Sequence, residues 1–553
     1  MRSLSKALIP KYPLPMRLRL IFIFLCSSFM ALQGQSFKRF TPEKTTYLQE
    51  LKQFWEDENS NLEDTAIEHL SRDFDSLFID QFTDEEAALL YDLSNGLLRK
   101  RMRDFEDWAH LLRISIWFKQ EQADGELERF YKDFEEVSKR PLKQSSVYLA
   151  TFYNVIHRNV LYDDGRLRWE VIGGIGQYRF ENGPVFSFDI SDLIGFYKND
   201  STLIEGTQGE FRPRQYQFEG QGGTGYFTRA GLTQDSAYVD IVKYSFDVTK
   251  PELEIDSVTL HTNFYLDQAV EGSWHEKLTS QSETGHATFP RFRSYRNDLY
   301  VPYILPYAQF KGGFSIIGDR FYGGGNDSNS RATIMLDYKD TVLIKATSRR
   351  FWLRRDKVYS EDVEAVIYLG NGDSIFHPKV TMRYLPEKKQ FSFIRNDEGM
   401  GSAIFSDSYH NLDMLFDIIT WDVGSPRMKI SSLNMGSTSP VVFESKNYYR
   451  GRRFDDLRGM SSSHPLVMLQ RLSQKMGGTR IFTDEDIAYH LKMDRSDAHR
   501  FLMRFSVLGF IDYSVQTREA YIKDKTFEYI LNAKGLRDFD VIQFVSRLEN
   551  GTN

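Results

Sequence analysis

The sequence predicts a multidomain α+β protein with an N-terminal helical bundle, a central all-β body and a C-terminal module of helices and a short β-ribbon. Three observations support this prediction. Apolar residues recur with a helical period from about Thr41 to His157. Near Leu161 the period changes to the alternation of strands, in a stretch rich in glycine and aromatic residues. Helix signals return at Pro465.

The N-terminal segment has the layout of a secretory signal. Residues 1–40 carry seven basic residues and no acidic one, and an apolar run over residues 20–32 precedes a polar stretch. The run is shorter than the roughly 20 residues of a membrane-spanning helix. We therefore predict a signal peptide over residues 1–35, with Met16 as the expected start, and an exported protein of the periplasm or outer membrane. The alternative is an N-terminal anchor that is never cleaved.

Cys26, the single cysteine, lies inside this apolar run. Leu25 precedes it, whereas a lipoprotein signal has a small residue before its cysteine. Removal of the signal would leave a mature chain without a thiol, which excludes disulfides, cysteine metal sites and a cysteine nucleophile. An exported chain of this size without disulfides must depend on its hydrophobic core, and a bacterial envelope is the expected setting.

Residues 36–160 form the predicted acidic helical domain, a bundle of five or six helices. Thr83 and Glu86 have the spacing of a capping box at the start of one helix. Residues 41–140 hold 25 acidic and 13 basic residues, a net charge of −12. This acidic face is either a docking surface for a basic partner or an ordinary solvated surface. The charge distribution is not that of a nucleic-acid-binding protein.

Residues 161–450 form the predicted β-rich repeat body. Short strands are expected at residues 168–172, 185–190, 238–248, 332–338, 365–369, 380–384 and 391–394. Glycines are expected to interrupt the strands at positions 173, 174, 220, 222, 223 and 225.

Four units of an acidic residue, a hydroxyl residue and aliphatic residues begin at Asp200, Asp256, Asp340 and Asp373. Asp side chains bond backbone amides in turns, so each unit is predicted to be a turn that leads into a strand. Repeated strand-turn units bury a continuous core through their neighbours. The prediction is a solenoid, a curled sheet or a sandwich, and ordinary hairpins that share this pattern by coincidence are the alternative.

Residues 289–295, 312–315, 368–370 and 373–375 carry a resemblance to known proteins. These segments are similar to those of large exported β-repeat proteins of Bacteroidota-type Gram-negative bacteria. The group has no assigned activity, so the resemblance implies an envelope β-fold and transfers no functional residue.

One run mixes bases with aromatic residues and is the candidate ligand or partner surface of the body. It contains Arg349, Arg350, Trp352, Arg354 and Arg355, and Tyr322 is grouped with it. Behind a signal peptide, an anionic glycan or a lipid head group is the expected ligand class. The alternative is a strand whose arginine stems cover apolar surface.

No residue pattern predicts catalysis, a cofactor or a metal. His275 lacks the second histidine of a zinc helix, and the other histidines, such as His377 and His464, are expected to be structural. The glycine-rich residues 323–327 are expected to form a β-turn rather than a calcium loop. A carboxylate pair for glycoside hydrolysis cannot be selected from the sequence.

The C-terminal segment is predicted to follow a linker at residues 451–463 and to form a separate module at residues 464–548. Three helices and a β-ribbon resemble a winged helix, whose third helix often enters the DNA major groove. Arg495, Arg500 and Arg504 lie on that helix. Because export removes DNA as a target, the module is interpreted as a protein-interaction or capping domain, and no nucleic-acid partner is expected for an exported chain. If the chain is not exported, DNA binding is the leading hypothesis for this segment.

The predicted function is that of a non-enzymatic envelope scaffold that binds partner proteins. A glycan-binding or glycan-degrading protein that uses the aromatic body is the first alternative. Carriage of lipid or lipopolysaccharide in a curled β-sheet is the second.

Overall fold

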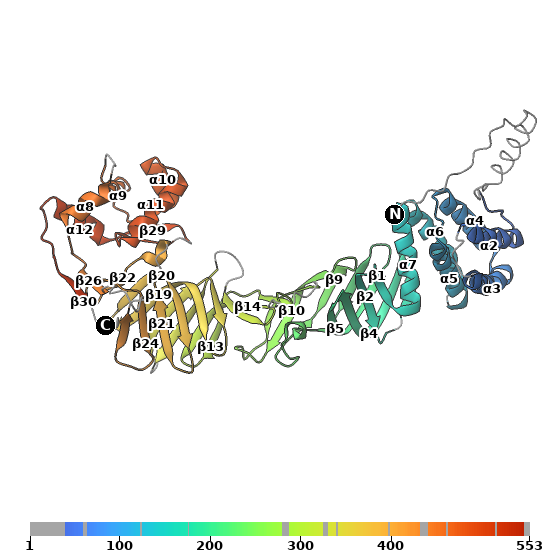
Figure 1. The fold of residues 1–553 in the computed structure, drawn as a ribbon, viewed down its shortest axis with the longest axis horizontal. Helices are drawn as coiled ribbons and strands as arrows, with labels where there is room; N and C mark the ends of the chain where they lie inside the picture. The colour runs from blue at the N-terminus through green and yellow to red at the C-terminus, as the bar shows by residue number, and fades with distance from the viewer. Residues whose placement is uncertain are drawn as a thin grey trace, which may run out of the picture. The chain divides into compact units, whose positions relative to one another are not determined.

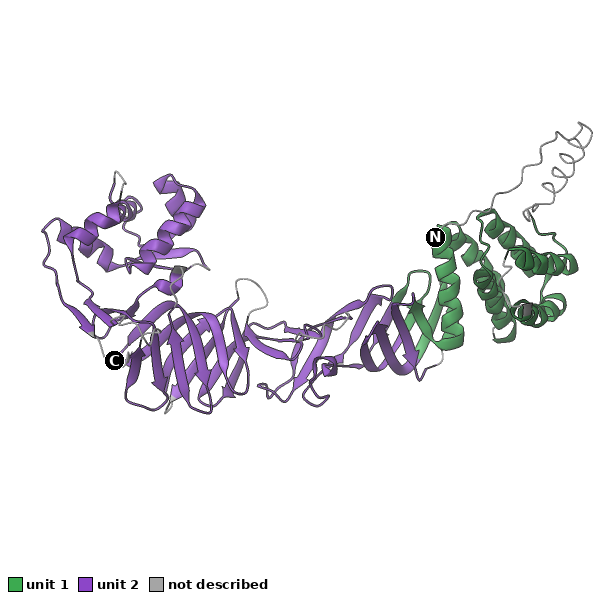
Figure 2. Ribbon diagram, viewed as in Figure 1, with its two compact units in different colours: residues 1–163, 175–188, 210–217 green, residues 164–174, 189–209, 218–553 purple. Residues whose placement is uncertain are grey.

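The computed structural model describes residues 39–58, 64–121, 124–174, 176–278, 287–324, 330–338, 341–395, 399–431, 441–459, 463–514 and 517–546. The chain divides into two compact units (Figure 2). The first comprises residues 1–163, 175–188 and 210–217, and the second comprises residues 164–174, 189–209 and 218–553. The predicted signal peptide and Asp340 lie outside the described residues, as do positions 325–327 of the glycine-rich loop.

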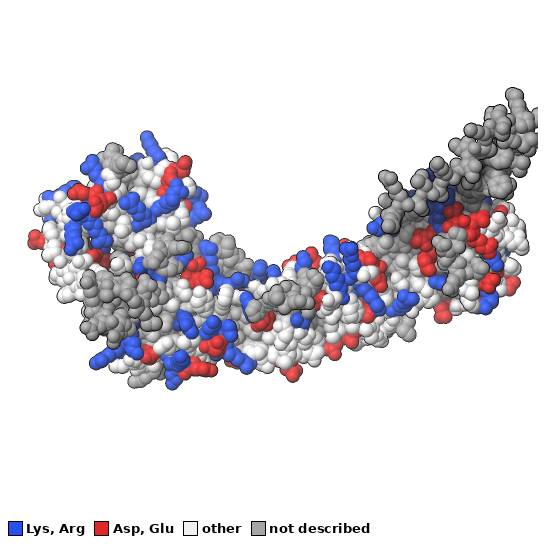
Figure 3. Space-filling model, viewed as in Figure 1, with Lys and Arg blue, Asp and Glu red and all other residues white. Residues whose placement is uncertain are grey.

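The first unit is largely helical, as predicted. Its helices are α2 (Lys44–Glu58), α3 (Asp64–Gln81), α4 (Asp84–Arg99), α5 (Phe105–Glu121), α6 (Glu126–Ser138) and α7 (Leu142–Arg158). The Thr83–Glu86 capping box is present at the start of α4, because the Thr83 side chain accepts from the Glu86 amide and the Glu86 carboxylate accepts from the Thr83 amide. The core is aromatic, with Trp108, Phe130 and Phe152 fully buried. Acidic side chains gather over this helical region in Figure 3.

Short strands complete the first unit. They are β1 (Val160–Asp163) and β3 (Gln177–Phe180), and β3 pairs with the start of β4 (Pro184–Tyr197). Tyr178 and Phe186 of these strands pack against Phe152 of α7. The change from helix to strand near Leu161 is therefore confirmed, because β1 begins two residues after α7 ends.

The second unit contains the β-body (Figure 1). Its strands are β2 (Leu167–Ile172), β5 (Asp200–Arg212), β6 (Gln217–Gln221), β7 (Thr224–Tyr226), β8 (Ala237–Ile241), β9 (Lys243–Asp247), β10 (Glu252–Thr262), β11 (Val270–Lys277), β12 (Arg291–Ser294), β13 (Leu299–Leu305), β14 (Ala308–Ile317), β15 (Arg320–Gly324), β16 (Ala332–Tyr338), β17 (Thr341–Ser348), β18 (Arg350–Leu353), β19 (Val358–Gly370), β20 (Asp373–Leu385), β21 (Gln390–Ile394), β22 (Phe405–Asp407), β23 (Leu412–Leu415), β24 (Ile418–Asp422), β25 (Met428–Ser431), β26 (Val441–Ser445) and β30 (Gln543–Ser546). Two 3-10 turns, η1 (Thr228–Ala230) and η2 (Gly399–Ser402), interrupt them.

The ladders of this body are antiparallel. A continuous series of pairings runs from β7 through β8, β10, β11 and β12 to β14. It continues through β16, β17 and β19 to β20. From β20 one branch leads through β21 and β24 to β25, and another leads through β22, β23 and β26 to β30. Side chains alternate between buried and exposed positions along most strands, which places one face of the sheet on the core.

The acid-hydroxyl units differ in structure, so they do not form one repeated turn. The units at Asp200 and Asp373 begin strands β5 and β20, in agreement with the prediction. Asp256 and Ser257 instead lie inside β10, where the register with β11 shifts between Ile255 and Val258. Both residues are exposed while Ile255 and Val258 are buried. A β-bulge thus adds one residue to the strand and returns the apolar side chains to the core face.

The prediction that glycines interrupt the strands is confirmed at positions 173, 174, 222 and 223, which lie between strands, and is wrong at two positions. Gly220 lies inside β6 and Gly225 inside β7. In place of breaking strands, these glycines make room for large rings. A Cβ on Gly225 would lie 3.0 Å from the Trp274 ring, and one on Gly220 would overlap the ring of Tyr244. Gly220 and Gly225 therefore pack directly against the rings of Tyr244 and Trp274.

The C-terminal part of the second unit contains helices α8 (Gly451–Arg458), α9 (Pro465–Lys475), α10 (Asp484–Leu491), α11 (Arg495–Val507) and α12 (Asp524–Ala533). A small antiparallel sheet joins β27 (Ile481–Thr483), β29 (Glu519–Ile522) and β28 (Ile511–Tyr513). The segment predicted as a linker contains α8, whose Leu457 is buried in the core of these helices.

A buried ion pair fastens this C-terminal module to the β-body. Lys525 at the start of α12 binds Asp413 of β23, and both side chains are almost fully buried. After α12 the chain returns to the sheet, where β30 pairs with β26. In Figure 1 the five helices lie beside the end of the body that contains β19, β20 and β22. The module and this end of the body are thus one compact assembly.

Candidate functional site

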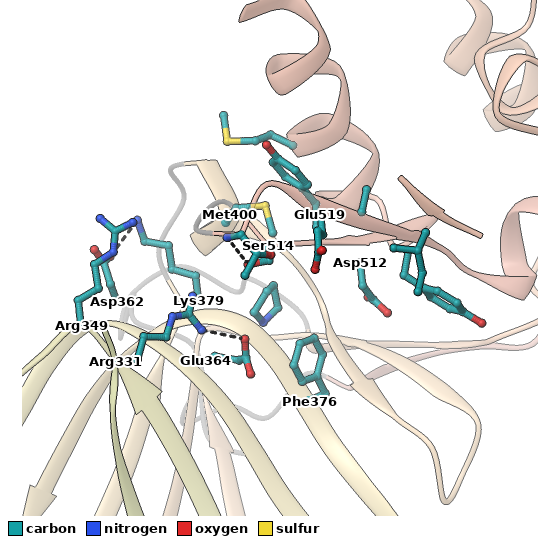
Figure 4. Close-up of a pocket in the computed structure, with 17 residues that line it drawn as sticks. Arg331, Arg349, Asp362, Glu364, Phe376, Lys379, Met400, Asp512, Ser514 and Glu519 are labelled. Atoms are coloured by element: carbon teal, nitrogen blue, oxygen red, sulfur yellow. Dashed lines mark hydrogen bonds and ion pairs between the residues drawn. The ribbon is translucent and has the colours of Figure 1, made fainter. Parts of the chain in front are cut away.

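A pocket of about 460 Å³ lies between the C-terminal module and the face of the β-body (Figure 4). One wall comes from strands β19 and β20 together with Arg331, the residue before β16, and Arg349, the residue between β17 and β18. The opposite wall comes from the hairpin of β28 and β29. The pocket therefore depends on the docking of the module, because neither wall encloses it alone.

The wall on the body carries five charged side chains, three bases and two acids. Arg331 forms an ion pair with Glu364 at 3.3 Å, and Lys379 forms one with Asp362 at 2.9 Å. Arg349, one of the predicted surface residues, adds a third base and is exposed. Figure 4 labels these five side chains on the body wall of the pocket.

The wall on the module is acidic at its rim and aromatic beside it. Glu519 is exposed on β29, and Asp512 of β28 binds Lys523 at 3.3 Å. The buried Tyr513 forms a hydrogen bond with His499 Nδ1 at 2.7 Å, which fixes its ring. Tyr521 is 42% exposed at the mouth of the pocket. A chain segment in the pocket would meet mixed charges with one base in excess on the body wall, and the carboxylates of Asp512 and Glu519 on the hairpin wall.

Apolar side chains from both parts line the interior. Met400 comes from η2 and Met503 from α11, and Phe376 of β20 completes the apolar lining. Methionine side chains adapt to irregular apolar surfaces, because they are unbranched and polarisable. This interior suits an apolar side chain of a bound polypeptide. The charged groups of the two walls would then form ion pairs and hydrogen bonds with the rest of that polypeptide.

The predicted surface of bases and aromatic rings is divided among three places, of which the pocket with Arg349 is the first. Arg350 lies over the Tyr322 ring, with its guanidinium carbon 4.4 Å from the ring centroid. Trp352 packs against Tyr359 at 5.6 Å and against the edge of Tyr322 at 6.3 Å, and is 42% exposed. Register places Tyr322 of β15 opposite Trp352 of β18, so the strands bring these side chains together.

Arg355 lies elsewhere, in a groove of about 450 Å³. Its guanidinium carbon is 4.4 Å from the centroid of the Phe264 ring. Tyr265 and the highly exposed Tyr303 also line this groove. Burial raises the pKa of Tyr265 to about 12, so this phenol keeps its proton at neutral pH. Arg354, which was predicted with this surface, instead forms an ion pair with Asp356 at 3.1 Å.

The arginines of α11 do not form a free basic surface. Arg495 binds Asp484 at 3.1 Å and also binds Glu485. Arg500 binds Asp497 in the preceding turn of the helix. The exposed Arg504 and Arg500 line a shallow depression of about 590 Å³, which also includes Arg453 of α8.

A buried charge cluster in the β-body has no counterpart in the sequence analysis. Arg229 of η1 lies 2.8 Å from Asp200 and also binds Glu276 of β11. Thr202 donates to the second oxygen of Glu276 at 3.3 Å. Burial raises the pKa of Glu276 to about 7, despite the neighbouring guanidinium. Because these residues are far apart in the sequence, no local pattern could have identified the cluster.

Other chemistry that was considered from the sequence has a structural explanation. His377 is fully buried, and its Nε2 lies 2.9 Å from the Ala403 carbonyl oxygen while its Nδ1 accepts from the Lys379 amide. Within the described ranges, no group of three or more His, Cys, Asp or Glu residues is arranged to hold a metal ion. No helix in the described part of the chain is long and apolar enough to cross a membrane.

Comparison of the chain with protein-family models, with curated proteins and with solved structures finds no match.

Proposed function

We propose that the protein is an exported envelope scaffold that binds partner proteins and performs no reaction of its own. The pocket between the hairpin of β28 and β29 and the β-body carries this proposal. It combines an apolar interior around Met503 and Met400 with the exposed base Arg349 on one wall and the exposed acid Glu519 on the other. The partner segment would place an apolar side chain between the two methionines and its own charged groups toward Arg349 and Glu519.

The test is an affinity purification from crosslinked envelope with a matched pair of variants. Met503→Glu places a charge in the apolar interior of the pocket, and we expect it to abolish recovery of envelope proteins. Met476→Glu places the same charge on the exposed end of α9, outside the pocket, and should leave recovery unchanged. Circular dichroism spectra of both variants check that they fold. Recovery that is equal for both variants, or wild-type protein that recovers no envelope protein, would sink the proposal.

We also propose finer descriptions of the two parts that form the pocket. The β-body is best described as a curled sheet or sandwich, because its ladders are antiparallel whereas a parallel β-helix stacks parallel strands. β14 pairs with β12, β13, β15 and β16, and such exchange of partners along one strand is typical of a sheet that bends. The order α9, β27, α10, α11, β28, β29 supports a winged-helix relationship for the module.

Glycan binding is the second candidate, favoured by the groove around Arg355. Aromatic faces at Phe264, Tyr265 and Tyr303 suit the apolar face of a sugar ring, and the guanidinium suits a carboxylate on that sugar. Tyr265 has a φ of 65°, a left-handed conformation that is unusual for a bulky residue. Unusual backbone of this kind concentrates at binding sites.

Retention on immobilised alginate, an acidic polysaccharide, tests this second candidate against dextran, a neutral one. We expect Tyr303→Ala and Arg355→Ala, both in the lining of the groove, each to reduce retention on alginate. Tyr489→Ala is the matched control, since Tyr489 is 81% exposed on α10 and lies outside the groove. Equal retention on both polysaccharides, or no effect of either substitution, would exclude a specific site here.

A further inference from the structure

The chain between α12 and residue 545 exposes an unusual number of apolar side chains. Leu536 is 70% exposed, Val541 68% and Phe544 61%. Phe539, Ile542 and Val545 are also exposed. Soluble proteins rarely leave a contiguous apolar segment in water, and an exposed segment of this kind marks an interaction site or a site of aggregation.

This segment forms the edge of the sheet. β30 pairs with β26, with Val442 opposite Val545 and Glu444 opposite Gln543. The Ser445 amide donates to the Ile542 carbonyl at 3.2 Å. Since backbone groups alternate in direction along a strand, those of residues 541, 543 and 545 point away from β26. Natural edge strands are usually protected by lysine, proline or another charge, and residues 541–545 contain none of these.

The sequence of this edge is close to a mirror image of itself. Residues 541–545 are Val-Ile-Gln-Phe-Val, with two apolar residues on each side of Gln543. An antiparallel pairing of two copies centred on Gln543 would set Val541 opposite Val545 and Ile542 opposite Phe544. The backbone groups that such a pairing needs, at residues 541, 543 and 545, are those that face away from β26.

We propose that β30 pairs with β30 of a second copy of this chain, so that two β-bodies form a continuous sheet across a twofold axis. A twofold interface requires a surface that is complementary to itself, and the mirror sequence around Gln543 meets this requirement. The pairing would satisfy the open backbone groups of the edge and place apolar side chains against one another on both faces. This inference is independent of the proposed partner pocket, because no residue of β30 lines that pocket.

Sedimentation velocity of the purified protein over a range of concentrations tests the proposal. The wild-type protein should form dimers. Val541→Lys combined with Val545→Lys sets lysine opposite lysine twice in the dimer, and we expect dimerisation to weaken on the order of tenfold or more. Val541→Lys combined with Val545→Glu sets lysine opposite glutamate twice and should restore the dimer, more strongly at low salt.

Leu536→Lys is the matched control, because Leu536 is as exposed as Val541 but lies outside the segment of residues 541–545 that forms the proposed pairing. This variant should dimerise as the wild type does. A wild-type protein that stays monomeric at all concentrations would overturn the proposal, and so would a dimer that survives the two lysines. A lysine-glutamate variant that stays monomeric while its circular dichroism is native would overturn the register centred on Gln543.

Discussion

The Glu276 carboxyl group is nearly fully buried, and its environment makes folding sensitive to pH. Burial raises the pKa of Glu276 to about 7 from an ordinary value of 4.5. Between these two pH values the folded state holds a proton that the unfolded state has lost. The contribution of Glu276 to the free energy of unfolding must therefore fall as the pH rises from about 4.5 to about 7.

Glu276→Gln should remove this contribution, since glutamine keeps the size of the side chain but does not titrate. Urea unfolding at several pH values between 4.5 and 7 measures the effect as a flatter dependence of stability on pH in the variant. Glu254→Gln, at an exposed position of β10, is the control and should leave the dependence unchanged. A variant whose pH dependence equals that of the wild type would show that Glu276 is already ionised in the folded protein.

Gly220 has a packing role that a single methyl group would disturb. Tyr244 is held in place by a hydrogen bond between its hydroxyl and Thr207 at 3.0 Å, so its ring cannot easily move away. We expect Gly220→Ala to lower the free energy of unfolding by about 1–3 kcal/mol through overpacking. Gly96→Ala in α4 is the opposite case, because a methyl group there would meet only the Arg99 guanidinium at 4.0 Å, an ordinary contact, and the change removes a helix-interior glycine. Thermal unfolding should find that this second variant gains about 0.5–1 kcal/mol.

At the scale of elements, the ion pair between Lys525 and Asp413 joins the C-terminal module to the β-body. Lys525→Met would leave the Asp413 carboxylate buried without a cation, which we expect to cost about 3–5 kcal/mol and to release the module to limited proteolysis. Lys523→Met breaks the partly exposed pair with Asp512 and should cost less than about 1 kcal/mol. If both variants resist protease equally, the buried pair is not what holds the module.

Local signals predicted the elements far better than their partners. The helix start at Thr83 followed from the spacing of three residues to Glu86, and its capping box is present. The strand at residues 238–248 was also expected, but the chain divides it into β8 and β9 at Val242, which is exposed. Strand pairing and the groove around Arg355 depend on residues distant in sequence, and a period of two carries no information about which strand lies beside which.

At the scale of the whole molecule, export would leave a protein without thiols. Cys26 is the single cysteine of the chain. We therefore expect a protein isolated from the envelope to react with no thiol reagent and to show the same midpoint of thermal unfolding with and without a reductant. Mass spectrometry of its N-terminus should place the first residue near position 36. A labelled thiol in that protein would show that the apolar run at residues 20–32 is retained.

The broad architecture followed from the sequence, because periodicity reports burial over whole segments. The return of the chain to the body at β30 did not follow, since the C-terminal module predicted at residues 464–548 included residues 541–545. Only three-dimensional placement reveals that Gln543 lies beside Glu444, 99 residues earlier, where their side chains form a hydrogen bond at 3.0 Å. The candidate pocket escaped prediction for the same reason, because its walls come from segments far apart in the chain.

The return of β30 makes the C-terminal module an insertion between two neighbouring strands, with both of its ends fixed on the same sheet edge. An insertion of this kind can be exchanged as a cassette, because the host fold needs only that β26 and β30 still meet. The body could thus have acquired, lost or replaced its helical attachment without rebuilding its own core. Proteins with this architecture would then be expected to share the β-sheet and to differ in the module inserted between β26 and β30.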